Sequence, residues 1–293
     1  MTGGRFSVGR LRTMPQAAAI TMAVLVVVIA SVATAVLAHG HGKASANNGT
    51  GVIGGVNGGG KGGGNGSDGG GTGAGSTGPS GTPTSHIPTV AAVPDTIVHA
   101  PEAAGKAVNI TIDDGPDPVW TPKVLDVLKQ HGVHATFCMI GPQAKAHPDL
   151  VRAVVAAGHR LCDHTVTHDE SMDHKPFAYQ QKEIMDAYAM IEEASGGAPV
   201  QYYRAPGGAF TPASRALAAQ HGMRPLGWNV DTKDYTKPGV GTIVQTIKYE
   251  LSNGPTILFH DGGGDREQTV DALEQILPWL KGQGYAFSFP KVK

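Results

Sequence analysis

Residues 106–140 read KAVNITIDDGPDPVWTPKVLDVLKQHGVHATFCMI, and this stretch decides the class of fold. The runs 108–113 and 135–140 are short, apolar and bounded by turn-forming or polar residues, which is typical of buried strands. Between them, residues 121–131 have the apolar spacing of a helix that packs one face against a core. A strand, a helix and a second strand in this order predict a parallel α/β arrangement.

The same alternation continues to the end of the chain, with prolines at helix starts and glycines after helix ends. Seven strands within about 188 residues fall below the usual size of an eight-stranded barrel. We therefore expect a distorted seven-stranded (β/α) barrel, and an open doubly wound sheet is the alternative. The remaining strands are expected at 160–163, 201–204, 223–228, 256–260 and 285–289, and the remaining helices at 142–157 with a break near Pro148, 176–195, 212–221, 240–252 and 267–281.

The N-terminal part predicts a membrane segment. Residues 1–16 contain three arginines and no acidic residue, and residues 17–38 form an uncharged apolar run of 22 residues. A run of this length can span a bilayer as a helix. The arginines predict that residues 1–16 are cytoplasmic, which places the rest of the chain outside the cell. We expect a single-pass signal anchor, and the alternative is a signal peptide cleaved after Ala38, which would release a secreted protein.

Residues 39–105 predict a flexible linker, since 20 of the 42 glycines fall between Gly40 and Gly81. Such a composition cannot bury enough apolar surface to offset the entropy lost on ordering. The folded domain is therefore expected over residues 106–293. The formal net charge of −1 gives no electrostatic reason to expect nucleic acid as a partner. We expect a monomer.

Polar residues follow the first and third predicted strands. Asp113 and Asp114 end the first strand, and adjacent carboxylates repel one another unless a cation or base lies near. His164 and His168 follow the strand at 160–163, and two histidines four apart can bind one metal ion. An Asp-Gly-Pro turn and a chance spacing are the alternatives. Together with Asp114, the histidines make the three-ligand set that is typical of a catalytic metal site.

Three further strand ends carry polar side chains, and in α/β barrels the active site is built at this face. Arg204 begins RAPGG (204–208) and could orient a carboxylate by paired hydrogen bonds. Asp234 lies in DTKDY (231–235), and His260 ends LFH (258–260). Each of these residues alone has a structural interpretation, a surface arginine or a structural histidine.

Taken in order, TIDDGP, HTVTH, RAPGG, DTKDY and LFH resemble the five motifs of the NodB-homology polysaccharide deacetylases, carbohydrate esterase family four. The resemblance covers residues 106–289, nearly the whole predicted domain. Two positions depart from the family pattern. Gly207 stands where the family has an aromatic residue, and Tyr235 stands where it has tryptophan. Both departures concern substrate choice more than the chemistry.

The resemblance implies a hydrolase that removes acetyl groups with the help of one divalent metal ion held by Asp114, His164 and His168. Zinc suits two imidazoles and one carboxylate, and cobalt, nickel and manganese are alternatives. The resemblance also implies that Asp113 is the general base, oriented by Arg204, and that His260 is the general acid, oriented by Asp234. It implies that the N–H of Gly207 donates to the oxyanion. Leu258 would line the pocket for the acetyl methyl group, and Tyr235 would offer an aromatic face to a sugar ring.

The glycan substrate follows from the predicted membrane attachment. An enzyme held at the outer face of a membrane meets the adjoining wall, so we expect N-deacetylation of N-acetylglucosamine units in a cell-wall polysaccharide, peptidoglycan first. O-deacetylation of acetylxylan and N-deacetylation of chitin oligosaccharides are the alternatives, since one site can hydrolyse esters and amides. The ligand and base positions are all retained, which argues against a non-catalytic binding module.

Cys138 and Cys162 lie on the second and third predicted strands. If these strands are parallel neighbours, they lie about 4.8 Å apart, within the reach of a disulfide. An exported domain meets an oxidising environment. We therefore predict a disulfide between the two cysteines, and two buried free thiols are the alternative.

Overall fold

The structure is a computed structural model of the chain, and it describes residues 91–293. The predicted membrane segment at 17–38 and most of the predicted linker lie outside these residues. Within residues 91–293, no helix is both long enough and apolar enough to cross a membrane.

The described chain forms one parallel sheet in the order β5-β4-β3-β2-β1-β7-β6, and β8 pairs with the start of β1. The two ends of this order, β5 and β6, do not pair with each other in the described part of the chain, so the sheet curls without closing. This half-barrel agrees with the expected distorted barrel. The strands are β1 Ala107–Asp113, β2 Thr136–Met139, β3 Arg160–Asp163, β4 Val200–Tyr203, β5 Arg224–Pro225, β6 Val230–Asp231, β7 Thr256–His260 and β8 Ala286–Ser288.

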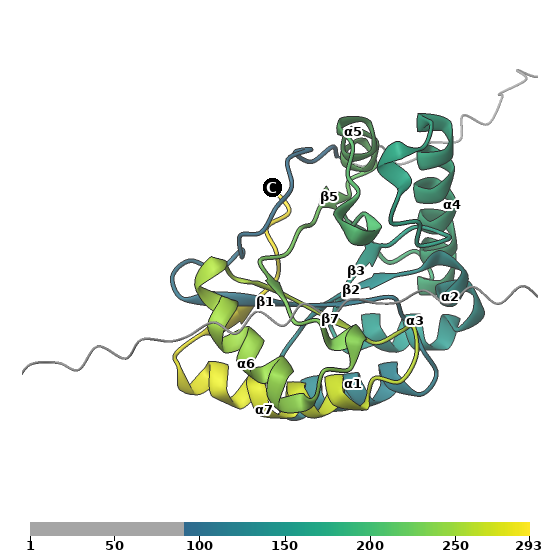
Figure 1. Cartoon of the computed structure of the whole chain (residues 1–293). Helices are drawn as coiled ribbons and strands as arrows, with labels where there is room; N and C mark the ends of the chain where they lie inside the picture. Colours follow the sequence, from purple (N-terminus) through teal and green to yellow (C-terminus); the bar gives the residue numbers. More distant parts are fainter. Residues whose placement is uncertain (1–90) are drawn as a thin grey trace, which may run out of the picture. The chain divides into compact units, whose positions relative to one another are not determined.

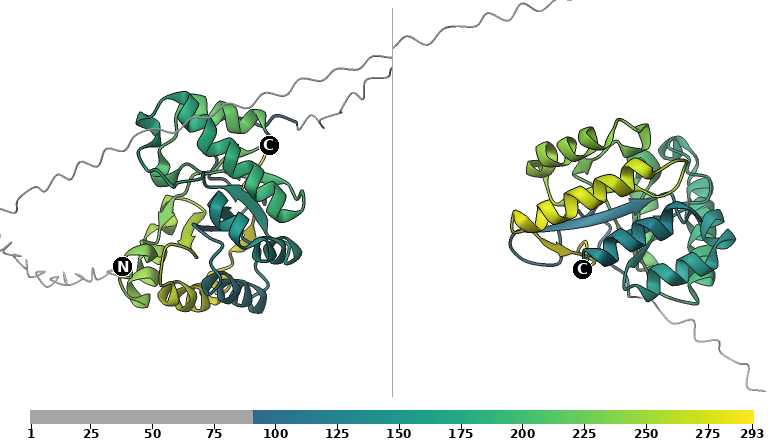
Figure 2. Two further views of the ribbon diagram at one scale, coloured as in Figure 1. Left: turned by 90° about the vertical axis from the view of Figure 1, so that its right-hand side faces the viewer. Right: turned by 90° about the horizontal axis from the view of Figure 1, so that it is seen from below.

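The helices pack around the outside of the curled sheet (Figure 1). Helices α1 and α7 lie over β1, as the view from below shows (Figure 2). The predicted break at Pro148 separates α2 from α3, because a proline can begin a helix but cannot donate a hydrogen bond within one. The helices are α1 Trp120–Gln130, α2 Gly141–Ala146, α3 Pro148–Ala156, α4 Phe177–Ser195, α5 Pro212–Gln220, α6 Val240–Glu250 and α7 Glu267–Gly282.

The central strand β1 shows how the sequence separates the core from the site. Val108, Ile110 and Ile112 belong to the large apolar cluster that the helices cover. Successive side chains of a strand point to opposite faces. The intervening residues Thr111 and Asp113 are buried polar residues on the other face, inside the curl. The alternation therefore places Asp113 on the inner face, at the carboxyl end of the strand.

Cys138 and Cys162 are register partners on the parallel strands β2 and β3, and a disulfide joins them. The pair is fully buried and belongs with Tyr202 and Leu226 to a second, smaller apolar cluster. The disulfide thus links the inner faces of two neighbouring strands below the site.

Two expectations at the strand level need correction. The strand expected at 223–228 is only the two-residue β5, and β6 was not expected at all. Val230 and Asp231 pair with Ile257 and Leu258 of β7. A strand of two residues is too short to show an alternating pattern, so its existence depends on the neighbour that it pairs with.

The domain also begins earlier than residue 106, within the range that we expected to be linker. Val98 is buried, and its backbone bonds with Pro225 and Gly227. Farther along, the N–H of Glu102 donates to the carbonyl of Phe289. Residues 93–105 therefore pack as part of the folded domain, beside its C-terminal end.

Candidate active site

One pocket lies at the carboxyl ends of the strands and receives residues from all five motifs, while Asp234 of the fourth motif lies just behind His260. Asp113 and Asp114 follow β1, the two histidines follow β3, and His260 ends β7. The pocket is lined by Asp113, Asp114, His164, His168, Glu170, Arg204, Ala205, Gly207, Trp228, Asp231, Tyr235, Leu258 and His260.

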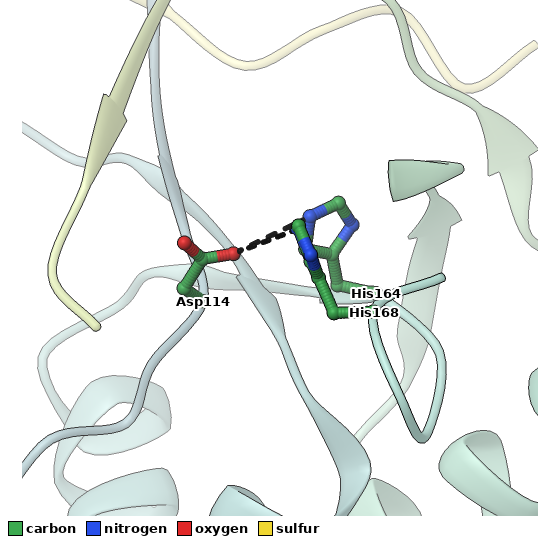
Figure 3. Close-up of side chains that lie close together, drawn as sticks. All are labelled: Asp114, His164 and His168. Carbon is green, nitrogen blue, oxygen red and sulfur yellow. Dashed lines mark ion pairs between the residues drawn. The ribbon is translucent and has the colours of Figure 1, made fainter. Parts of the chain in front are cut away.

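Asp114, His164 and His168 point toward one another (Figure 3) and have ligand atoms within 4.8 Å of one another. The Oδ1 atom of Asp114 lies 3.3 Å from Nε2 of His168 and 3.6 Å from Nε2 of His164. This oxygen is buried and has no hydrogen-bond partner among residues 91–293. A buried, unpaired carboxylate oxygen that faces two imidazole nitrogens fits a divalent cation.

The surroundings of His164 keep its imidazole neutral, which is the form that binds a metal ion. Its Nδ1 lies 2.8 Å from the carbonyl oxygen of Arg204, which only accepts hydrogen bonds, so Nδ1 carries the proton. The lone pair of Nε2 then faces Asp114. Burial lowers the pKa of His164 to about 3, which keeps the imidazole neutral.

The backbone of this region adopts conformations that are uncommon for residues other than glycine. Asp114, Thr165 and His168 have φ values of 77°, 69° and 55°. Such strain is kept only where neighbouring contacts hold it in place. A Cβ at position 262 would collide with the backbone carbonyl of Asp114, so Gly262 permits this close approach.

Glu183 of α4 holds the loop between the two histidines from outside the pocket. Its Oε2 accepts hydrogen bonds from the N–H of Val166 (3.1 Å), the N–H of Thr167 (2.8 Å) and the hydroxyl of Thr167 (3.0 Å). The residue is buried, so these contacts replace its hydration. One side chain thus satisfies three donors that lie between His164 and His168.

Asp113 is held by Arg204, the largest of the fully buried side chains. Nη1 of Arg204 donates to Oδ1 of Asp113 at 2.6 Å, and the guanidinium also donates to Thr111 and to the carbonyls of Leu226 and Gly227. Burial raises the pKa of Asp113, and the charge of Arg204 offsets this only in part. The free oxygen, Oδ2, lies 3.5 Å from Nε2 of His164, next to the ligand set.

His260 and Asp234 form a second buried pair. Nδ1 of His260 lies 2.7 Å from Oδ1 of Asp234, and Oδ2 of Asp234 accepts from the N–H of His260 and the hydroxyl of Thr269. Burial disfavours the charged imidazole, but the hydrogen bond and charge of Asp234 outweigh it and raise the pKa of His260 to about 9. The imidazole is therefore protonated near neutral pH, with Nε2–H available to the pocket.

The remaining predicted residues also lie at the pocket. Tyr235 is 43% exposed and meets the His260 ring edge-on, with 5.1 Å between centroids, while Leu258 is buried in the pocket wall. The sequence analysis missed Trp228, which faces the guanidinium of Arg204, and Glu170. Trp228 was placed at a predicted strand end, which was a usable signal, whereas nothing local marked Glu170.

Comparison with known proteins identifies the family. The polysaccharide deacetylase profile matches residues 100–226. A peptidoglycan-N-acetylglucosamine deacetylase of Bacillus cereus is 40% identical over 187 residues, which are 62% of this chain and 85% of the relative. The chain belongs to the polysaccharide deacetylase family. It is thus a hydrolase that acts on amide bonds, and the resemblance of the five motifs is confirmed.

Two further relatives extend this finding. A chitooligosaccharide deacetylase of Sinorhizobium fredii is 36% identical over 189 residues, covering 61% of this chain and 87% of the relative. A solved peptidoglycan N-acetylglucosamine deacetylase, in complex with an N-oxidanyl-benzamide, has a TM-score of 0.60 and 31% identity, covering 66% of this chain and 89% of that one. The similarity therefore spans nearly all of the described domain.

Proposed function

We propose that this deacetylase removes acetyl groups from N-acetylglucosamine units of cell-wall peptidoglycan, with one divalent metal ion. The observation that carries the proposal is the meeting of two buried pairs at one pocket. In the first pair, Arg204 holds the carboxylate of Asp113 in place. In the second pair, Asp234 keeps the imidazole of His260 protonated. The 40% identical relative is named for the same substrate.

Asp114, His164 and His168 would hold the metal ion, which when bound supplies a Lewis acid that acidifies water and polarises the acetyl carbonyl. Two imidazoles and one carboxylate favour zinc. Cobalt, nickel and manganese accept the same donors, so metal analysis must decide among them.

Asp113 would accept the proton of the attacking water. Arg204 occupies Oδ1, which leaves Oδ2 for the proton. The raised pKa of the buried carboxyl makes it a stronger base than an exposed aspartate. Arg204 itself stays within the wall and acts on the reaction only through Asp113.

The N–H of Gly207 would donate to the oxygen that becomes negative as the carbonyl is attacked. Within residues 91–293 this N–H donates no hydrogen bond, so it is available to substrate. Leu258 offers an apolar wall for the acetyl methyl group, and Tyr235 and Trp228 offer aromatic faces for sugar rings.

His260 would give the proton from Nε2 to the departing amine nitrogen. An amide nitrogen leaves poorly unless it is protonated, so a base and an acid in one pocket match this reaction. Asp234 keeps the imidazole charged before the transfer. The products are acetate and a glucosamine unit.

The direct test is mass spectrometry of the products after the purified chain acts on peptidoglycan, chitin oligomers and acetylxylan. We expect acetate release from peptidoglycan, with glucosamine units that carry a free amine left in its glycan chains. The second candidate substrate is a chitooligosaccharide, which the 36% identical relative favours. Activity on acetylxylan alone would remove the proposal and favour an ester hydrolase.

A further inference from the structure

The guanidinium of Arg204 is held in part by carbonyl groups that lie at one edge of the curled sheet. Its Nε donates to the carbonyl oxygen of Leu226 at 3.1 Å, and its Nη2 donates to that of Gly227 at 3.0 Å. Leu226 and Gly227 directly follow β5, which is an edge strand of the sheet. Two acceptors of this guanidinium therefore belong to the backbone that continues an edge strand.

Val98 pairs with this backbone on the edge that faces away from β4. The N–H of Val98 donates to the carbonyl of Pro225 at 2.8 Å, and its carbonyl accepts from the N–H of Gly227 at 3.0 Å. Val98 and Leu226 thereby form a parallel bridge, and both side chains are buried in the smaller apolar cluster. On the β4 side, the N–H of Leu226 donates to the carbonyl of Tyr203 at 2.8 Å. The backbone that carries the two acceptors is thus fixed from both sides.

His99 packs against the same backbone with its side chain. A Cβ at position 227 would collide with Nε2 of His99, so the imidazole lies directly against the residue whose carbonyl accepts from Arg204. The carbonyl oxygen of His99 accepts from the hydroxyl of Thr256 at 2.6 Å, at the start of β7. Residues 98–99 therefore connect the continuation of β5 to β7, which is the neighbour of the other edge strand, β6.

We propose that Val98 and His99 are positioning residues for the catalytic base. They hold the two carbonyls that orient the guanidinium of Arg204, and Arg204 in turn holds the carboxylate of Asp113. An arginine side chain has many rotamers, so acceptors at fixed positions are needed to keep it in one of them. The inference rests on the proposed function, in which Asp113 accepts the proton of water. The end of the predicted linker is accordingly part of the catalytic apparatus.

The first test is the kinetics of Val98→Ala and His99→Ala in the full-length chain, with an N-acetylglucosamine tetramer as substrate. We expect kcat to fall about three- to ten-fold in each variant, with KM nearly unchanged, because a displaced base slows proton transfer while the sugar-binding wall stays intact. The matched control is Val292→Ala, which shortens a valine packed against the same apolar cluster. It should keep the wild-type kcat.

A double-mutant cycle with Arg204→Lys separates positioning from a general loss of stability. If Val98 and His99 act through Arg204, their substitution has little further effect on kcat once Arg204→Lys has been introduced. Effects that are independent of Arg204 would multiply instead. Unfolding temperatures of all variants show how much of each effect follows from stability.

The side-chain Nε–H of Arg204 reports on its position without metal or substrate. This group is buried and bonded to the carbonyl of Leu226, so its hydrogen should exchange slowly with solvent. In nuclear magnetic resonance spectra, Val98→Ala and His99→Ala should accelerate this exchange relative to that of the backbone N–H of Ile110 in β1. The control Val292→Ala should leave the ratio of the two exchange rates unchanged.

Three results would contradict the positioning role. These are an unchanged kcat in both variants, effects that multiply with that of Arg204→Lys, and an exchange ratio of Arg204 to Ile110 that stays at its wild-type value. A wild-type chain that releases acetate from no N-acetylated glycan would instead contradict the proposed function. The exchange measurement would still decide whether residues 98 and 99 hold Arg204.

Discussion

Asp113 and Asp114 are neighbours in sequence, but the backbone directs them to different tasks. Asp113 ends β1 in extended conformation and meets Arg204 on the inner face of the sheet. Asp114 has a φ of 77°, and its carboxylate faces the two histidines. Each of the two adjacent carboxylates therefore has its own partners, the guanidinium of Arg204 for Asp113 and the two histidines of the proposed ligand set for Asp114.

Asp113→Asn should separate these tasks. We expect turnover to fall by roughly 10²–10⁴, the usual contribution of a general base, with about one metal ion per chain retained. His168→Ala should lose both metal and activity. Metal analysis after dialysis, together with kinetics, checks both variants. If Asp113→Asn loses its metal, the assignment of base and ligand is wrong. Its unfolding temperature is needed as a control, because Arg204 would lose its buried counter-charge.

Asp234→Asn should change the pH dependence of the reaction. Burial disfavours the protonated form of His260, and Asp234 is the main group that opposes this effect. Without that charge the pKa of His260 falls from about 9, so the acid loses its proton at lower pH. The alkaline limb of kcat/KM against pH should therefore move to lower pH. Thr269→Val removes only a hydrogen bond to Asp234 and should move the limb less; an unmoved limb in Asp234→Asn would exclude His260 as the acid.

At the scale of elements, the loop from β3 to α4 depends on a distant side chain. Glu183→Ala should weaken metal binding by about 10–100-fold, the usual effect of losing a group that orients ligands. The reason is that three donors between His164 and His168 would lose their acceptor. Calorimetric titration of the metal-free protein with zinc measures the effect, and Glu193→Gln on the same helix is the control. Unchanged zinc affinity would mean that Glu183 stabilises the fold but does not contribute to metal binding.

The disulfide between β2 and β3 should stabilise the domain by about 3 kcal/mol. The two cysteines are 24 residues apart in the sequence. Closing a loop of this size lowers the conformational entropy of the unfolded chain, which raises the free energy of the unfolded state by about that amount. The Cys138→Ala/Cys162→Ala double variant should therefore unfold at lower denaturant concentration. Thiol titration of the unfolded, unreduced wild-type protein should find no free thiol. Two free thiols would contradict the pairing.

The elements also show what sequence could and could not predict. The strands β3 and β7 have the predicted bounds, because both are buried runs flanked by clear turns. All five motifs were found, since each is a local pattern at a strand end. Trp228 was missed as a pocket residue although it ends a predicted strand, whereas Glu170 was missed because it reaches the pocket only through the curl of the sheet. No local pattern encodes that curl, and it also determines the short pairings of β5 and β6.

At the scale of the whole molecule, the deacetylase domain is one part of the chain and the apolar run at 17–38 is another. That run lies outside the described residues, so the membrane anchor stays a prediction from sequence. Residues 93–105 pack as part of the described domain, so the predicted linker is shorter than expected and covers residues 39–92. A glycine-rich chain of that length spans about 40 Å on average and about 180 Å when extended. This reach suits a substrate in the adjoining wall.

We therefore expect the full chain to remain in the membrane fraction of its host, with the catalytic domain outside. The arginines before residue 17 favour this orientation, and the 22-residue run is long for a cleaved signal. Cell fractionation, protease treatment of intact cells and the N-terminal sequence of the mature protein check the prediction together. An anchored protein keeps residues 17–38 and loses its external domain to the protease. A mature protein that begins at His39 and appears in the medium would contradict the anchor. It would also weaken the case for peptidoglycan, because a freely diffusing enzyme can reach soluble chitin oligomers or acetylxylan equally well.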